Sequence, residues 1–268
     1  MSEGVISYLL ADSLSWGEFI CFIVFDCSFL VVSLLFMRNK IFDSQPTTED
    51  ETKRRRTQLA WILSCLNGLL TSIMGVIYIY IRYNRQGQLL STISFQLVVE
   101  PSAAEMLLGR DNMSIIMITH LAVNNIIDLL FGSIYYSEHL DIGTGWIHHI
   151  FYVVMIRGCI TGDAIIFRIA PFTKGLGILL LLEIPTFILA LGRILPKYRS
   201  DLCFGITFFS FRILFHGYFI LCTVLSNMSI DPGHYFFLIS TFIIHCYWFF
   251  NWFRRYGIRL FKRKIRIE

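Results

Sequence analysis

The sequence predicts an all-α membrane protein with about seven transmembrane helices. Only 16% of the 268 residues are charged and 55% are hydrophobic, whereas a soluble domain carries about 25% charged residues. The charges stand in short blocks between long apolar runs, and no run alternates with the period of two that is typical of a membrane barrel. Backbone groups in the bilayer must therefore bond within helices. No stretch remains that is long enough for a soluble catalytic domain.

Seven apolar segments account for the membrane crossings. Each is near the roughly 20 residues that a helix needs to cross the hydrocarbon core of a bilayer. The fourth is the weakest prediction, because it carries Arg157, Asp163 and two histidines, and it could be shorter, tilted or broken. The segments are residues 17–37, 59–81, 113–136, 146–167, 175–195, 203–226 and 233–253.

The basic residues orient the predicted bundle. With the N-terminus lumenal and the C-terminus cytosolic, 16 of the 23 lysines and arginines lie on the cytosolic side and 5 on the opposite side, as the positive-inside rule requires. The chain then divides into an N-terminal segment with the first helix, a polar and basic cytosolic loop, a membrane domain and a basic cytosolic tail. Their bounds are 1–38, 39–58, 59–253 and 254–268.

The partners that the sequence indicates are membrane lipids. The basic run from Lys53 to Arg56 adjoins a span, which favours anchoring at lipid headgroups over binding to nucleic acid. The seven cysteines stand almost all within spans, at unrelated spacings, so we expect neither a disulfide framework nor a metal site. The sequence leaves a homo-oligomer open.

The adjacent residues His148 and His149 open the fourth apolar segment. Two imidazoles at this place are costly to bury and gain nothing from packing alone. Because histidine can transfer protons near neutral pH, the pair indicates a functional site.

Other polar residues also interrupt the apolar segments, and each is costly there unless it faces the interior of the bundle. Four of them form one stripe on the third segment at 100° per residue. Such residues either line a polar cavity or bond between helices, where each supports packing by about 0.6–2 kcal/mol. We favour a cavity, because the stripe on the third segment, which contains Asp128, faces the histidine pair across a short loop. The set comprises His120, Asn124, Asp128 and Tyr135 on the third segment, and Asp163, Glu183, Arg212 and His216 on later ones.

Four short motifs follow one another along the membrane domain, and they carry a resemblance to a known family. They are Asn124-Asn-Ile-Ile-Asp128-Leu-Leu with Tyr135 after it, Trp146-Ile-His148-His149-Ile, Leu181-Leu-Glu183-Ile-Pro185-Thr, and Phe208-Phe-Ser-Phe-Arg212-Ile. In this order and spacing, about residues 55–255 resemble the TLC-domain family, which includes ceramide synthases and other lipid-homeostasis proteins. The resemblance implies six core helices around a lipid-accessible central cavity, one extra N-terminal helix, and residence in the endoplasmic reticulum membrane.

The chain departs from the ceramide synthases after the histidine pair. Those enzymes carry a second cluster of paired aspartates there, and this chain has the single Asp163. We therefore expect a lipid-handling protein whose polar intramembrane cavity binds a lipid or an acyl chain. The residues expected to line that cavity are His120, Asn124, Tyr135, Asp163, Glu183, Arg212 and His216, around His148 and His149.

Two alternatives stay open. The first is an acyl-CoA-dependent N-acyltransferase of ceramide-synthase type, which would act on a sphingoid-type or other lipid amine. It would use acyl-CoA as co-substrate, no other cofactor, and His148, His149 and Asp128 as catalytic candidates. The second is a serpentine receptor, because seven helices with a lumenal or extracellular N-terminus also describe that class. A short N-terminus and the lack of an extracellular cysteine pair count against the receptor.

Overall fold

The computed structural model describes residues 7–9, 11, 14–41, 43, 48–84, 110–161, 172–225 and 232–257. Within this part of the chain the fold is all-helical, without strands, which confirms the predicted fold class. The α-helices are α2 (Trp16–Ile41), α3 (Glu49–Asn84), α6 (Asn112–Tyr135), α7 (His148–Thr161), α8 (Thr173–Leu179), α9 (Ile184–Ile194), α10 (Asp201–Phe208), α11 (His216–Leu225) and α12 (Pro232–Trp252). Short 3-10 and π turns join several of them.

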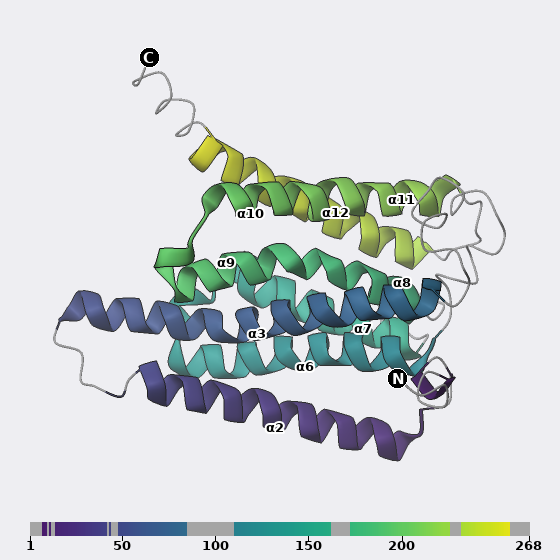
Figure 1. Ribbon diagram of the computed structural model, residues 1–268, viewed down its shortest axis with the longest axis horizontal. Helices are drawn as coiled ribbons and strands as arrows, with labels where there is room; N and C mark the ends of the chain where they lie inside the picture. The colour runs from purple at the N-terminus through teal and green to yellow at the C-terminus, as the bar shows by residue number, and fades with distance from the viewer. Residues whose placement is uncertain are drawn as a thin grey trace.

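Six helical units of the described part of the chain are long and apolar enough to cross a membrane. The turn η4 (Leu180–Glu183) joins α8 and α9 into one unit, and the π turn η6 (Phe209–Phe215) does the same for α10 and α11. The other four units are α2, α3, α6 and α12. The fourth predicted span, 146–167, corresponds to a shorter apolar helix, Gly145–Ile160. The helices run back and forth along one axis, and α2 begins at the opposite end of the bundle from the end of α12 (Figure 1).

One structured region differs from the sequence prediction. The segment 39–58 was expected to be a loop, but α3 begins at Glu49 and continues without a break into the apolar residues. The reason is local: the hydroxyl of Thr48 accepts the N–H of Glu51 as a helix cap, and Glu51 pairs with Arg55 one turn later. A capped and charge-paired helix can extend beyond the hydrocarbon, where hydropathy alone does not detect it.

Within the described residues, the membrane-length units other than α2 form a closed ring together with the shorter helix α7. Going around it, α3 packs on α6, α6 on α7, α7 on α12, α12 on the α10–α11 unit, the α10–α11 unit on the α8–α9 unit, and the α8–α9 unit on α3. The contact between α7 and α12 is aromatic: Phe151 stacks on Phe237 with ring centroids 5.8 Å apart, and His148 meets Trp248 at 5.3 Å. A ring of helices can enclose an interior that is separate from the surrounding lipid.

The N-terminal helix α2 lies outside this ring, along α6 and α3 (Figure 1). Its inner face buries Leu30 and Leu34 against Leu63 and Ile127, whereas outward residues such as Phe25 are 70% exposed and suited to lipid. Hydrophobic burial does not distinguish protein from lipid in a bilayer, so packing and polar contacts must hold the helix. Asp26 supplies such a contact, because its carboxylate lies 2.8 Å from Nδ1 of the buried His120 on α6.

Two ring helices, α3 and α9, approach each other closely at Gly68 of α3. A Cβ atom there would lie 2.7 Å from the backbone nitrogen of Phe187 in α9, a distance that real contacts do not reach. Small residues let membrane helices pack backbone to backbone. The van der Waals contacts of such packing hold the helices together in a bilayer, where the hydrophobic effect does not.

We predict that Gly68→Ala destabilises the protein by about 1–3 kcal/mol, because the added methyl group forces α3 and α9 apart. The free energy of unfolding in mixtures of SDS and mild detergent measures this. The control is Gly17→Ala, since a Cβ atom at Gly17 has no atom within 4 Å. Equal stabilities of the two variants would contradict a close α3–α9 contact.

Candidate functional site

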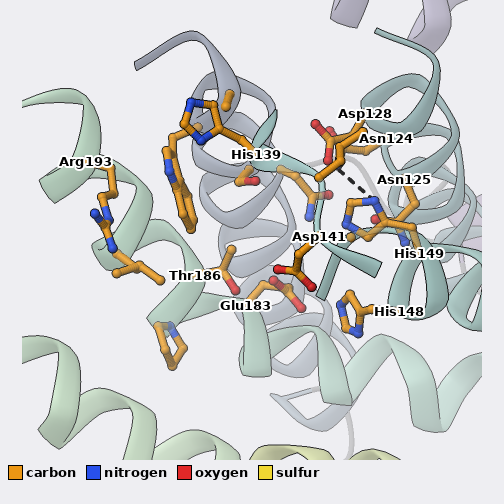
Figure 2. Close-up of a pocket in the computed structure, with 18 of the residues that line it drawn as sticks. Asn124, Asn125, Asp128, His139, Asp141, His148, His149, Glu183, Thr186 and Arg193 are labelled. Carbon is orange, nitrogen blue, oxygen red and sulfur yellow. Dashed lines mark ion pairs between the residues drawn. The ribbon is translucent and has the colours of Figure 1, made fainter. Parts of the chain in front are cut away.

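The ring of helices encloses a polar cavity of about 550 Å³. It reaches the surface at the end of the bundle where α3 begins and α6 and α9 end, because Thr57, His139 and the exposed Arg193 line it there. Its deeper part lies among membrane-spanning helices. Figure 2 shows the labelled polar side chains converging on one space from several helices. The polar and charged lining residues are Thr57, Trp61, Ser64, Asn67, Asn124, Asn125, Asp128, Tyr136, His139, Asp141, His148, His149, Tyr152, Glu183, Thr186, Arg193, Arg212 and Trp248.

Asp128 connects two other side chains in the wall of this cavity. One carboxylate oxygen accepts a hydrogen bond of 2.5 Å from the hydroxyl of Tyr136. The other lies 3.4 Å from Nδ1 of His149 (Figure 2, dashed line), a separation whose geometry is not that of a hydrogen bond. Asp128 and Tyr136 are 5% and 2% exposed. The arrangement is a phenol, a carboxylate and an imidazole in sequence, with the imidazole at the cavity.

Tyr136 keeps its proton in this arrangement. Burial raises the pKa of the Tyr136 phenol, and the charge of Asp128 raises that pKa further. The phenol therefore remains a hydrogen-bond donor throughout the physiological pH range. Its donation holds the carboxylate of Asp128 in one orientation, with the second oxygen directed to His149.

His148 lies beside His149 but has different neighbours. Its ring centroid is 5.5 Å from that of His149, 4.6 Å from that of Tyr152 and 5.3 Å from that of Trp248. Its Nδ1 is buried, and no group in the described part of the chain hydrogen-bonds to it. Aromatic packing thus holds the His148 ring, and one polar atom is left without a partner.

The opposite wall depends on two irregular helical turns that contact each other, η4 and η6. Pro185 lies in the first turn of α9 and cannot donate a backbone hydrogen bond. Next to this point the Leu182 carbonyl accepts 2.8 Å from Nε of Arg212, which is placed by the π turn. The other end of the Arg212 guanidinium donates 2.7 Å to the Thr186 hydroxyl and lies 3.4 Å from a Glu183 carboxylate oxygen. Arg212 therefore ties the two broken helices together.

The side chain of Arg212 is also enclosed by rings. The guanidinium carbon lies 5.3 Å from the Phe208 ring centroid and 5.8 Å from that of Trp248. A guanidinium is weakly hydrated and favours aromatic faces, so this residue tolerates burial at 6% exposure. The pairing also offsets the charge of Glu183 at the cavity wall.

Six of the residues singled out in the sequence line this cavity. They are Asn124, Asp128, His148, His149, Glu183 and Arg212.

Three others lie elsewhere. His120 turns from the stripe on α6 towards Asp26 of α2, and Tyr135 stacks on Phe131. His216 faces His245, with their Nδ1 atoms 3.1 Å apart. Asp163 is outside the described residues.

Sequence reasoning missed several residues of the cavity wall. A helical projection favours Tyr135, but the backbone of Tyr136 leaves the helix at φ −151° and ψ 42°, and its side chain occupies the cavity instead. Asn67 could have been found, because it is a lone amide within the second apolar segment. Arg193 and His139 lie at helix ends, where polar residues are ordinary and give no signal.

The described residues contain no group of three or more histidine, cysteine, aspartate or glutamate side chains that could hold a metal ion. All seven cysteines are free thiols. The imidazoles and carboxylates of the cavity can form hydrogen bonds, carry charge and transfer protons.

We predict that Arg212→Leu destabilises the protein by about 3–5 kcal/mol, because it leaves the Glu183 carboxylate and the Leu182 carbonyl without their cationic donor. Unfolding in detergent mixtures measures the loss. The double variant Arg212→Leu/Glu183→Leu should recover part of it, since no unpaired charge remains. Arg199→Leu is the control, because Arg199 is a more exposed arginine outside the cavity, paired with Asp201. A loss no larger than that of the control would contradict the tie between the two turns.

Comparisons with models of protein families, with curated proteins and with solved structures found no match. The geometry and chemistry of the cavity are therefore the guide to function.

Proposed function

We propose that this protein is a lipid-handling membrane protein that binds a lipid or its acyl chain in the intramembrane cavity, with the polar part of the lipid at His149 and Asp128. The observation that carries the proposal is a set of buried polar atoms at the cavity wall that have no hydrogen-bond partner in the described part of the chain. They are Oδ1 of Asn67, Oδ1 of Asn124, Nδ1 of His148 and Nδ1 of His149.

Polar atoms without a hydrogen-bond partner are costly inside the bilayer. A buried group without a hydrogen bond costs about 1–3 kcal/mol, and in a bilayer such residues mark sites of function. Four of them converge on one cavity whose volume falls within the range of about 300–1,000 Å³ that is typical of ligand sites. A ligand with several donors and acceptors would satisfy them.

The apolar part of the cavity wall supports a lipid over a fully polar ligand. Leu121, Leu189, Phe204 and Phe208 line the large cavity beside its polar residues, so an apolar chain would have side chains to pack against. A second cavity adjoins it at Tyr152 and Glu183, but its volume of about 30 Å³ leaves room only for a water-sized group.

The resemblance to TLC-domain proteins supports the same reading, because four of the family's ordered landmarks contribute residues to the cavity. With that resemblance we further propose that the protein resides in the endoplasmic reticulum membrane. The basic blocks at residues 53–56 and 193–199 stand at the end where the cavity reaches the surface. By the positive-inside rule this end is cytosolic and the N-terminus lumenal, which protease accessibility of terminal tags would test.

We predict that lipid copurifies with the wild-type protein and that His149→Ala lowers the amount by about tenfold, the factor that corresponds to 1.4 kcal/mol. Bound lipid is extracted after size-exclusion chromatography and quantified by mass spectrometry. The matched control is His120→Asn, which removes a buried histidine outside the cavity. A wild-type protein that carries no lipid would overturn the proposal, as would equal lipid on both variants and the wild type.

The second candidate function is acyl transfer from acyl-CoA to a lipid amine. The specific observation in its favour is the order Tyr136, Asp128, His149, in which a carboxylate oxygen lies 3.4 Å from an imidazole nitrogen, close to the arrangement of many general bases. In such a reaction the amine would attack the thioester carbonyl while His149 takes its proton, and the C–S bond would break with the CoA thiolate leaving and receiving that proton from the imidazolium. Asp128 would stabilise the imidazolium that forms.

We predict for this candidate that membranes containing the wild-type protein transfer a labelled acyl group from acyl-CoA to a long-chain amine. His149→Ala should lower the rate by at least about a hundredfold, the lower range for losing a general base. Tyr136→Phe should have a smaller effect, because it removes only the orienting hydrogen bond. Unchanged transfer in His149→Ala, or no transfer by the wild type, would exclude it and leave lipid binding to be judged by the copurification test.

A further inference from the structure

A second pair of histidines lies outside the large cavity. His216 of α11 and His245 of α12 are both 1% exposed, and their Nδ1 atoms lie 3.1 Å apart. Aromatic side chains surround the pair: the Phe242 ring centroid is 5.5 Å from that of His216, and the Phe208 centroid is 6.2 Å from that of His245. A hydrogen bond joins one donor to one acceptor, so one of the two Nδ1 atoms carries a proton and the other does not. This contact therefore uses one nitrogen of each ring.

The other ring nitrogen of His216, Nε2, is also buried. No group in the described part of the chain hydrogen-bonds to it, and the same holds for the hydroxyl of Thr241, a residue that is 3% exposed. Both side chains line one small cavity of about 30 Å³. A buried water molecule needs about 10–15 Å³ and two to four polar partners. The small cavity therefore has the size and the polar groups that suit one water molecule.

The small cavity adjoins the large one. Tyr152 and Glu183 line both of them. The phenol of Tyr152 lies close to the Thr241 hydroxyl, although without the geometry of a hydrogen bond. A water molecule between His216 and Thr241 is thus next to groups that also border the large cavity.

We propose that the small cavity binds one water molecule, held by Nε2 of His216 and the hydroxyl of Thr241, and that this water lets the His216–His245 pair exchange protons with the large cavity. Water suits Nε2 in either tautomer of His216, because water both donates and accepts hydrogen bonds. Where Nε2 carries no proton, it gains an N–H bond as an O–H bond of the water breaks, and the water regains a proton from the large cavity. The Nδ1 contact then spreads the positive charge over both rings. The inference concerns proton access and does not depend on lipid binding.

The charged neighbours of the pair leave this exchange reversible. Arg212 of η6 and His148 of α7 act on the pair electrostatically, and Glu183 of η4 is already engaged by Arg212. Within the described residues, the close contacts between histidine and carboxylate groups lie elsewhere. A proton that reaches the pair is therefore not trapped in an ion pair and can return to the large cavity.

Exchange of the Cε1 hydrogen of histidine in D2O, located by peptide mass spectrometry, tests this site in the purified full-length protein. The exchange requires that water and protons reach the ring. We expect His216 to exchange in the folded protein while His120 does not, because His120 is also buried but lines neither cavity. His149, which lines the large cavity, is the internal reference, and its unchanged rate shows that a variant has kept its fold.

Variants of Thr241 test the water itself. Thr241→Val removes the hydroxyl at nearly constant shape, and we expect it to slow exchange at His216 by about fivefold, the factor that one hydrogen bond of ordinary net strength represents. Thr241→Ile also fills the space of the water with a methyl group and should stop the exchange. The matched control is Thr223→Val, because Thr223 is a buried threonine of α11 that lines neither cavity. It should leave the rate at His216 unchanged.

The variant His216→Phe tests the path to the second histidine. It should stop exchange at His245, because the protons of His245 arrive through His216. A wild-type His216 that exchanges as slowly as His120 would overturn the inference. So would an unchanged rate in both Thr241 variants, an equal loss in Thr223→Val, or exchange at His245 that survives His216→Phe.

Discussion

The inability of hydrocarbon to hydrogen-bond with a peptide group is the constraint on which the structure depends. It makes every crossing a helix, and it makes every polar side chain within the crossings a liability unless another group satisfies it. The ring of six helical units resolves this by turning polar residues inward, away from lipid. Asp128 and Arg212 are almost fully buried, whereas Leu130 and Ile134 on the outer side of α6 are among the most exposed residues. An enclosed polar interior within an apolar shell follows from that single rule.

The site is built where the helices are irregular. An unbroken α-helix uses its own carbonyls, so it has none to offer to a neighbour. At the 3-10 turn before Pro185 and the π turn around Arg212, this regularity is lost, and Arg212 binds the Leu182 carbonyl across the interface. The end of α6 acts in the same way, since the departure of the backbone at Tyr136 turns a phenol onto Asp128. π turns often occur at functional sites, and this cavity has irregular backbone in several of its walls.

Hydropathy was sufficient to predict the fold class and nearly all the crossings, because the bilayer selects for length and composition. Polarity within spans was sufficient to find Asp128, His149, Glu183 and Arg212, since their cost is visible in any apolar run. Polarity within spans could not predict that Tyr136 lines the cavity, because the direction of its side chain depends on backbone angles at the end of α6. It also could not predict that His120 faces away from the cavity. The partner of His120, Asp26, lies 94 residues away on another helix, and no periodicity within one helix can reveal such a pairing.

In the proposed function, lipid enters the ring of helices and does not merely surround it. Photocrosslinking with a single-chain lipid amine that carries a diazirine near its polar end tests this most directly, because peptide mass spectrometry locates each adduct. We predict adducts on inward residues such as Asn124, His149 and Tyr152, and we expect unlabelled lipid to compete with them. Adducts confined to outward residues of the same helix, Ile126 and Leu130, would contradict it.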